Sequence, residues 1–342
     1  MPKPTHLTCL CGSIKEPASL LQSQTLPIDD AFCHCNRCRR NTGALGTTYA
    51  QLKGPPIAKS LDNATAYHTA KFEHYFCKEC GCNIFARCKT DGRWIACSGT
   101  IEIDREPGKE ANVSKVTLHE HVGAANDGGI APYLSHLSGR DVPCYLGEPE
   151  GEAMQKSELR QLQEKAFNVP SSVERGEALD VACHCEQVRL RIKPPPYDEK
   201  SEGWYVPPDR SKYYARLCCC RSCRLTTGFT MQPWTYILPS QIHTSTGERV
   251  IFGPEAKEKS QIEGLKYYQS SECVLRSFCT TCGATIFYQS FERPYIIDVS
   301  VGVLRSTMGN ALVGEWLDWD RQVVSKRNEA VDEELIRAWL KE

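Results

Sequence analysis

The feature that most constrains this chain is a three-cysteine motif that occurs once in each half. Its spacing is C-x-C-x-x-C, and its members are Cys33, Cys35 and Cys38 in the first half and Cys218, Cys220 and Cys223 in the second. Three thiolates on so short a loop can converge on one metal ion, but they fill only three positions of a tetrahedron. Structural zinc normally has four protein ligands, whereas three ligands and an open position are typical of zinc that acts on a bound substrate. The motif therefore predicts two open zinc sites.

Two further cysteine pairs flank each three-cysteine motif. A C-x-C pair comes first and a C-x-x-C pair comes last, with the cysteines Cys9, Cys11, Cys77 and Cys80 in the first half and Cys183, Cys185, Cys279 and Cys282 in the second. The C-x-C pair needs two more ligands, and the C-x-x-C-G motif can supply them because its glycine lets the backbone turn around the sulfur. The spacing therefore predicts one closed, structural zinc site in each half.

The many cysteines could either form disulfides or bind metal. The chain has 20 cysteines in 342 residues, and its first residues lack the apolar core of a secretion signal. Clustered thiols in such a chain favour metal binding over disulfides.

The formal net charge of −1 and the lack of a Lys/Arg block argue against a nucleic-acid partner. All apolar runs are far shorter than the roughly 20 residues that span a bilayer, so we expect a cytoplasmic protein with no membrane partner.

The repeated motifs predict the domain organisation. The second set follows the first at offsets of 174 (Cys9 to Cys183), 185 (Cys33 to Cys218) and 202 (Cys77 to Cys279), so the second half contains insertions of 11 and 17 residues. We assign the first insertion to the proline-rich segment 194–208. The domains are predicted to span 1–147 and 176–342, joined by a linker over 148–175.

Strand-forming residues predict a mainly β fold. The expected strands are 47–52, 83–88, 94–103, 188–192, 285–288 and 295–301. A segment rich in Glu, Gln and Lys predicts a helix over 157–166 within the linker. An amphipathic pattern predicts a second helix over 331–340, with Val331, Leu335, Ile336 and Trp339 on one face.

Each half resembles the glutathione-dependent formaldehyde-activating family. The domain of that family carries C-x-C-G, then C-H-C-x-x-C-R with a nearby glycine, then F-C-x-x-C-G, and the first half has all three motifs at 9–12, 33–43 and 76–81. The second half has Glu186 where the first has Gly12, and Cys219 where the first has His34. The resemblance implies two tandem Mss4-like zinc-binding β domains joined by a partly helical linker. It also implies two Zn²⁺ ions per domain, a structural one on the outer motifs and a reactive one on the middle motif.

The activity that the resemblance implies is that of a zinc-dependent carbon–sulfur lyase or synthase. Its substrate is glutathione or a glutathione conjugate, as in the formation of S-(hydroxymethyl)glutathione, and a homo-oligomer is compatible with it. Zinc lowers the pKa of a bound thiol, so the thiolate is present at neutral pH. Arg39 and Arg224 directly follow the last ligand of each middle motif. They are candidates to donate to the sulfurs or to hold a substrate carboxylate, or else they are solvated surface charges.

Several alternatives stay open. A fourth protein ligand such as Cys82, Cys88 or Cys97 would close the middle site, and a closed site favours a non-catalytic zinc module that binds protein or chromatin. Alternatively, the second half is a degenerate scaffold beside an active first half. The first half alone ends in a segment with His119 and His121, which favours it as the catalyst.

A histidine pair on a strand is more often a packing or surface feature than a metal site, so we predict neither His119 nor His121 as a ligand. The six cysteines outside the motifs are expected to be buried apolar residues: Cys82, Cys88, Cys97, Cys144, Cys219 and Cys273.

Overall fold

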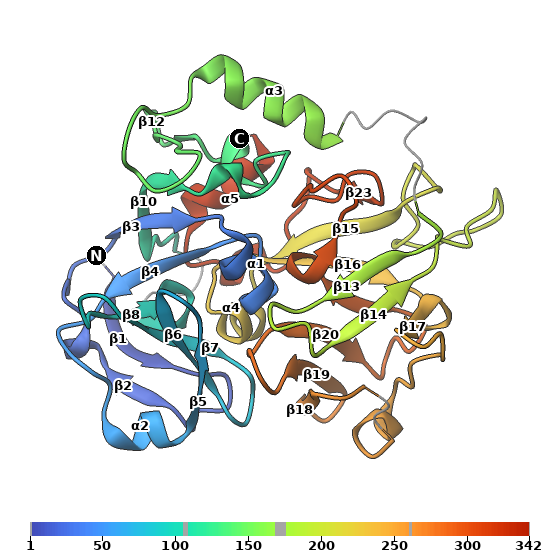
Figure 1. The fold of residues 1–342 in the computed structure, drawn as a ribbon, viewed down its shortest axis with the longest axis horizontal. Helices are drawn as coiled ribbons and strands as arrows, with labels where there is room; N and C mark the ends of the chain where they lie inside the picture. Colours follow the sequence, from blue (N-terminus) through green and yellow to red (C-terminus); the bar gives the residue numbers. More distant parts are fainter. Residues whose placement is uncertain (1, 105–108, 168–175, 260–261, 342) are drawn as a thin grey trace.

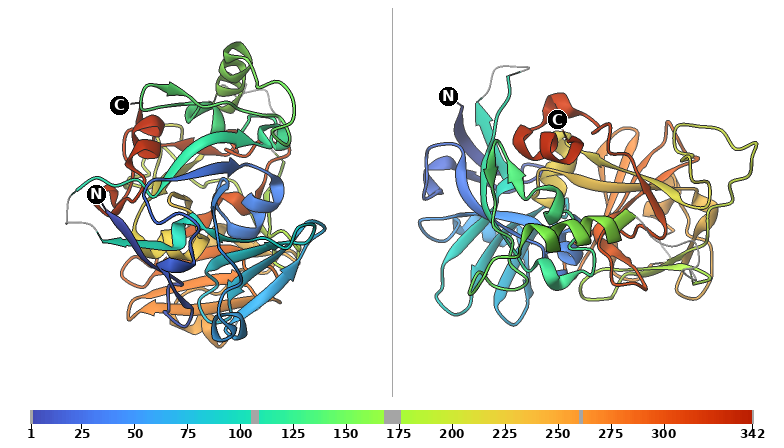
Figure 2. Two further views of the ribbon diagram at one scale, coloured as in Figure 1. Left: turned by 90° about the vertical axis from the view of Figure 1, so that its left-hand side faces the viewer. Right: turned by 90° about the horizontal axis from the view of Figure 1, so that it is seen from above.

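The computed structural model describes residues 2–104, 109–167, 176–259 and 262–341, and it shows two β-rich halves that lie side by side (Figures 1 and 2). The strands of the first half are β1 (Lys3–Thr8), β2 (Lys15–Pro17), β3 (Ile28–Cys33), β4 (Thr47–Gln51), β5 (Ala64–His68), β6 (Phe72–Cys77), β7 (Asn83–Cys88), β8 (Trp94–Cys97), β9 (Ile101–Asp104), β10 (Ser114–Glu120), β11 (His136–Leu137) and β12 (Arg140–Asp141).

The strands of the second half are β13 (Leu179–Ala182), β14 (Arg189–Ile192), β15 (Tyr213–Cys218), β16 (Gln232–Ile237), β17 (Ile242–Thr244), β18 (Leu265–Ser271), β19 (Val274–Cys279), β20 (Thr285–Ser290), β21 (Ile297–Ser300), β22 (Leu304–Arg305) and β23 (Leu317–Trp319). The α-helices of the described residues are α1 (Asn36–Thr42), α2 (Ala58–Asp62), α3 (Lys156–Phe167), α4 (Arg221–Thr227) and α5 (Glu333–Leu340).

The two halves have the same sheet topology. The first half forms a seven-stranded sheet of order β10-β3-β4-β8-β7-β6-β5 and a three-stranded sheet of order β2-β1-β9. The second half repeats them as β23-β15-β16-β21-β20-β19-β18 and as β14-β13-β22, with β17 added beside β14. In each large sheet one edge strand runs parallel to its neighbour, β10 beside β3 and β23 beside β15. The prediction of a mainly β, duplicated fold is confirmed.

The predicted strands are found, with one difference. The segment 94–103, expected as one strand, is divided by the 3₁₀ turn η2 (Ser98–Thr100) into β8 and β9. β8 belongs to the seven-stranded sheet and β9 to the three-stranded sheet. The turn therefore carries the chain from one sheet to the other, which a continuous run of strand-forming residues does not reveal.

The two halves contact each other through two equivalent contacts, each between a helix of one half and a turn of the other. α1 packs on the 3₁₀ turn η7 (Val301–Val303), and α4 packs on η2. The Gly302 N–H donates to Gly43 O at 3.0 Å, and the Gly99 N–H donates to Gly228 O at 2.9 Å. A Cβ on Gly302 would lie 2.2 Å from a backbone oxygen of the first half. Glycine therefore permits the backbones to touch here.

One hydrophobic core crosses the boundary between the halves. Phe32 of β3 and Phe229, which follows α4, are both buried, and their ring centroids are 4.8 Å apart. The same core contains Val116 of the first half and Val299 and Leu317 of the second. The two sheets therefore share part of their packing, while a second cluster that includes Leu7, Ile84 and Phe85 lies almost wholly within the first half.

The C-terminal helix joins both halves, as the right view of Figure 2 shows. Leu335, Ile336 and Trp339 of α5 are buried, as the amphipathic pattern predicts. The Trp339 ring lies 5.6 Å from Tyr133 of the first half and 5.6 Å from Trp319 of the second, centroid to centroid. Although it belongs to the second domain in sequence, this helix packs against both.

The predicted linker helix is present as α3. It packs on the 3₁₀ turn η4 (Ala131–Tyr133), where the Tyr133 hydroxyl donates to Gln163 O at 3.0 Å. Residues 168–175, the last part of the predicted linker, lie outside the described residues. No helix within the described ranges is long and apolar enough to cross a membrane.

Candidate metal centres and their pockets

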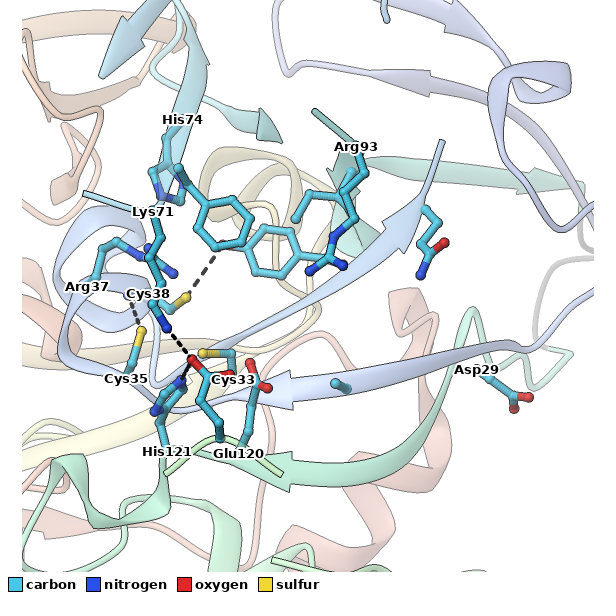
Figure 3. Close-up of a pocket in the computed structure, with 16 residues that line it drawn as sticks. Asp29, Cys33, Cys35, Arg37, Cys38, Lys71, His74, Arg93, Glu120 and His121 are labelled. Carbon is cyan, nitrogen blue, oxygen red and sulfur yellow. Dashed lines mark hydrogen bonds and ion pairs between the residues drawn. The ribbon is translucent and has the colours of Figure 1, made fainter. Parts of the chain in front are cut away.

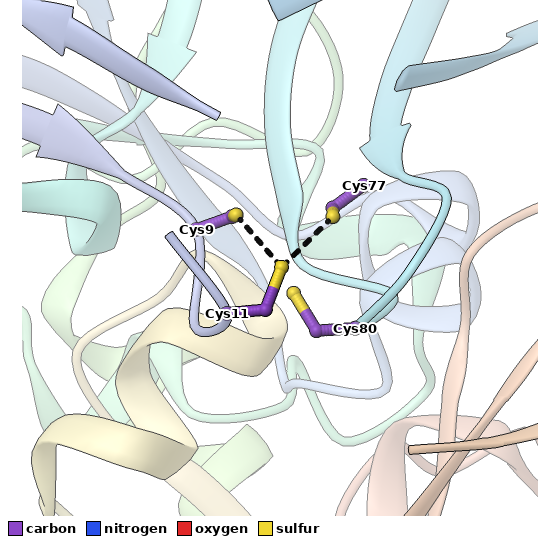
Figure 4. A group of neighbouring side chains, drawn as sticks. All are labelled: Cys9, Cys11, Cys77 and Cys80. Atoms are coloured by element: carbon purple, nitrogen blue, oxygen red, sulfur yellow. Dashed lines mark hydrogen bonds between the residues drawn. The ribbon is translucent and has the colours of Figure 1, made fainter. Parts of the chain in front are cut away.

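The outer motifs of the first half come together in a four-cysteine cluster (Figure 4). The Sγ atoms of Cys9, Cys11, Cys77 and Cys80 all lie within 4.8 Å of one another, and the Cys9–Cys11 and Cys11–Cys77 distances are 3.5 Å. Tetrahedral zinc with Zn–S bonds of about 2.3 Å requires sulfurs about 3.8 Å apart. The donor set and spacing therefore fit a closed zinc site.

The second half has the matching cluster of Cys183, Cys185, Cys279 and Cys282, again within 4.8 Å. In both halves the glycine after the last cysteine has a positive φ, +73° at Gly81 and +75° at Gly283. A Cβ on Gly81 would lie 2.3 Å from the Phe278 ring, and one on Gly283 would lie 2.5 Å from the Phe76 ring. The Phe and Gly of the two F-C-x-x-C-G motifs therefore meet across the boundary between the halves.

The three sulfurs of each middle motif also lie close together, but the motif is not a loop. Cys33 ends β3, Cys35 precedes α1, and Cys38 lies inside α1. The Cys35 Sγ accepts a hydrogen bond from Cys38 N at 3.3 Å, which caps the helix. The second half repeats this arrangement, with Cys220 Sγ accepting from Cys223 N at 3.4 Å. A strand end and a helix start therefore hold the three sulfurs.

The position of a fourth ligand separates an open site from a closed one. In the described part of the chain no fourth cysteine joins either three-cysteine cluster within 4.8 Å, so Cys82, Cys88 and Cys97 do not close the first site. His121 and Glu120 do group with Cys33 at that distance. The residues beside the first cluster are therefore a histidine and a carboxylate.

The first three-cysteine cluster opens on a pocket of about 470 Å³ (Figure 3). Its charged lining residues are three cations, Arg37, Lys71 and Arg93, and three carboxylates, Asp29, Glu120 and Glu148. Lys71 Nζ pairs with Glu148 Oε1 at 2.5 Å, and both side chains are half-exposed or more. The pocket thus presents both signs of charge next to the sulfurs.

Two polar side chains, Tyr49 and the buried His74, complete the wall of this first pocket. The Tyr49 hydroxyl lies 3.5 Å from Cys38 Sγ. His74 is 5% exposed, and its Nε2 has no hydrogen-bond partner among the described residues. Burial lowers the pKa of His74 to about 3, so the imidazole is neutral at physiological pH.

His119, near the end of β10, and His121, just after it, have different environments. His119 is fully buried, with Nδ1 2.9 Å from His34 Nε2 and Nε2 3.0 Å from Leu134 O. It is a packing residue, as expected. His121 has a positive φ of 56° and lines the first pocket, with Nε2 3.5 Å from Glu148 Oε1. The sequence singled out the segment with His121 but not its place in the pocket, because the left-handed turn that aims it there has no motif.

The second three-cysteine cluster opens on a pocket of about 500 Å³ with a different lining. Cys223 Sγ accepts from Trp234 Nε1 at 3.4 Å and from Arg276 Nη1 at 3.7 Å. Burial disfavours the charge of Arg276, but the Cys223 and Cys220 sulfurs raise its pKa, so it stays protonated. This cation lies directly against the sulfur cluster.

Arg39 and Arg224 lie at the boundary between the halves and line neither pocket. Arg224 is 2% exposed, and it donates to two backbone carbonyls of the first half at 2.5 and 3.0 Å and to Glu102 Oε2 at 3.0 Å. Arg39 is 4% exposed and donates to Asn36 Oδ1 at 2.5 Å. Both guanidinium groups are buried away from the pockets, so neither the predicted contact with sulfur or substrate nor the alternative of solvated surface charges fits these positions.

Five of the six remaining cysteines are buried, as expected: Cys82, Cys88, Cys97, Cys144 and Cys219. Cys273 is only partly buried, because it lies in the turn between β18 and β19.

A family model described as "Glutathione-dependent formaldehyde-activating enzyme" matches residues 4–114 and 206–314. Both three-cysteine motifs and both C-x-x-C-G motifs fall inside these regions. Comparison with curated proteins gives no significant match. Among solved structures, a crystal structure of a Rhodobacter sphaeroides protein matches with 20% identity and a TM-score of 0.26, over 41% of this chain and 99% of that one.

Proposed function

We propose, from the premise that this chain belongs to the glutathione-dependent formaldehyde-activating family, that the first pocket is an active site for carbon–sulfur chemistry. The substrate is glutathione or a glutathione conjugate, and the reaction makes or breaks the bond between its sulfur and a small carbon electrophile. Family membership supports the reaction class, and the lining of the pocket supports the choice of half.

The observation that carries the proposal is that three sulfurs open onto a pocket with charges of both signs. Glutathione is a zwitterion with two carboxylates and one ammonium group. Arg37, Lys71 and Arg93 offer donors to the carboxylates, and Asp29 and Glu120 offer acceptors to the ammonium group. A volume of about 470 Å³ lies within the range of small-molecule sites.

The proposed reaction is the addition of a thiol to an aldehyde. The sulfur of the thiolate gives its electron pair to the carbonyl carbon, the π electrons of C=O move to oxygen, and that oxygen takes up the proton lost by the thiol. A zinc ion held by Cys33, Cys35 and Cys38 would supply the lowered pKa of the thiol. His121 lines the pocket beside Cys33, and we propose that its imidazole exchanges the proton with the oxygen. The reverse steps cleave the same bond.

Zinc-loaded protein, glutathione and ¹³C-formaldehyde test the proposal, with the exchange rate between free aldehyde and hydroxymethyl adduct measured by NMR. We expect enhancement over the uncatalysed rate, a loss of at least about tenfold in Cys35→Ser, and retention in Cys220→Ser. Cys88→Ser, which replaces a buried cysteine outside the clusters, is the matched control. No enhancement by the wild type, or a loss confined to Cys220→Ser, would contradict the assignment.

One observation favours a second function, a zinc-stabilised binding module without catalysis. His121 and Glu120 lie close enough to Cys33 to share a metal ion with it. If either closed the first site, no position would remain for a thiol. In that case replacing the closing residue, His121→Ala or Glu120→Ala, would create glutathione binding that the wild type lacks, whereas an active enzyme would bind glutathione before the His121→Ala change and lose turnover after it.

A further inference from the structure

The two pockets occupy the same place in the duplicated fold but have different chemistry. The strand registers show that five residues lining the first pocket and five lining the second occupy equivalent positions in the two copies. In order, Ala31, Tyr49, Gln51, His74 and Ile95 are equivalent to Arg216, Trp234, Tyr236, Arg276 and Asp298. At these positions the first pocket has no charged residue, apart from a histidine kept neutral by burial. At the same positions the second pocket has two arginines and an aspartate, and Arg293, from the turn between β20 and β21, adds a third arginine to its lining.

An exposed tryptophan lies over the second pocket. Trp204 belongs to the proline-rich insertion that the first half lacks, and 47% of it is exposed. Its ring lies 4.7 Å from the Tyr236 ring at 79°, and Tyr288 and Trp234 form another ring pair at 6.2 Å. All four residues line the pocket. An indole that the fold leaves half in water, at the mouth of a pocket with three other aromatic side chains, offers a face to a planar ligand.

Two arginine side chains stand among these rings. The Arg293 guanidinium lies 5.5 Å from the Trp204 ring and 5.6 Å from the Tyr288 ring, and Asp298 holds it at 2.6 Å. Arg276 is 3% exposed and lies 4.8 Å from the Tyr288 ring. The pocket is lined by four cationic side chains, the others being Arg216 and Lys326, against two carboxylates, Asp298 and Glu329. Arg216 is itself paired with Asp320 at 2.6 Å, but the buried Nη1 of Arg293 has no hydrogen-bond partner among the described residues, so a charged donor is left for an anionic ligand.

We propose that the second pocket is a separate binding site for a ligand that has a planar aromatic group and an anionic substituent. The aromatic group packs against Trp204 and Tyr236, and the anion faces Arg276 and Arg293. Glutathione fits this site less well, because it has no aromatic ring to pack against Trp204 and Tyr236. The inference does not depend on the reaction proposed for the first pocket.

The test compares two probes that both carry a thiol and a carboxylate, 4-mercaptobenzoate and 3-mercaptopropionate. Binding to the zinc-loaded full chain is measured by titration calorimetry. We expect the aromatic probe to bind at least about tenfold more tightly, and Trp204→Ala to remove most of this advantage. Tyr236→Gln, which introduces the residue of the corresponding first-half position, should do the same, and Trp204→Phe should restore much of it.

Tyr295→Ala is the matched control. Tyr295 is 50% exposed, and its ring lies 5.7 Å from the ring of Tyr205, the residue that follows Trp204 in the insertion. Tyr295 does not line the pocket. Equal affinities of the two probes would overturn the proposal, as would an aromatic preference that survives both Trp204→Ala and Tyr236→Gln, or an equal loss in Tyr295→Ala. The formaldehyde exchange assay scores the first pocket separately, so failure of one proposal leaves the other to be judged by its own measurement.

Discussion

At the scale of single residues, glycine decides how closely the two halves approach. A Cβ on Gly302 would lie 2.2 Å from the backbone oxygen of Ala44 and 2.5 Å from the carbonyl carbon of Gly43. Backbone atoms cannot move aside as a flexible side chain can, so we expect Gly302→Ala to lower the free energy of unfolding by about 1–3 kcal/mol. Gly54→Ala, where no atom lies within 4 Å of the added Cβ, is the control. Urea denaturation of the zinc-loaded protein measures both, and equal midpoints would contradict this account of the contact.

At the scale of elements, the segment before α5 is tied to the first half by a buried carboxylate. Asp332 Oδ1 accepts from Val113 N and Ser114 N, both at 2.7 Å, and Oδ2 has no partner within the described ranges. Burial raises the pKa of Asp332 to about 8, from about 3.9 in an unfolded chain. The folded state therefore holds this proton more tightly, so its stability should fall as the pH rises from about 4 to 8. Asp332→Asn should flatten that fall in urea denaturation at several pH values, whereas the exposed Asp180→Asn should not; unchanged slopes in both would exclude Asp332 as the cause.

At the scale of the whole molecule, the core that crosses the boundary and the reciprocal glycine contacts predict that the two halves unfold as one cooperative unit. Gly81, next to Cys80, packs on Phe278 of the other half. We therefore expect Cys80→Ser, which removes one sulfur of the first closed cluster, to lower the melting temperature of the chain as a single transition. Hydrogen exchange should rise in β19–β21 of the second half as well as in the first. Cys88→Ser is the control, and loss of protection confined to the first half would show that the halves unfold separately.

The mainly β fold and its duplication were predictable from the sequence because they depend on local signals. Metal-ligand spacing brings sulfurs together within a few residues, and strand composition acts over similar distances. The helix over 331–340 was recognisable from its periodicity, although its first turn begins later, at Glu333. The division of 94–103 into β8 and β9 was not predictable, because only the tertiary structure shows that the chain changes sheets there.

By itself, the sequence determined which cysteines gather and that the gathering occurs twice. Only the tertiary structure decided what surrounds them: His121 beside the first cluster, Trp204 and Arg276 beside the second, and Arg224 away from both. The physical reason is that a ligand motif is a short-range pattern of spacing, whereas the lining of a pocket depends on strand register and on side chains brought together from distant parts of the chain.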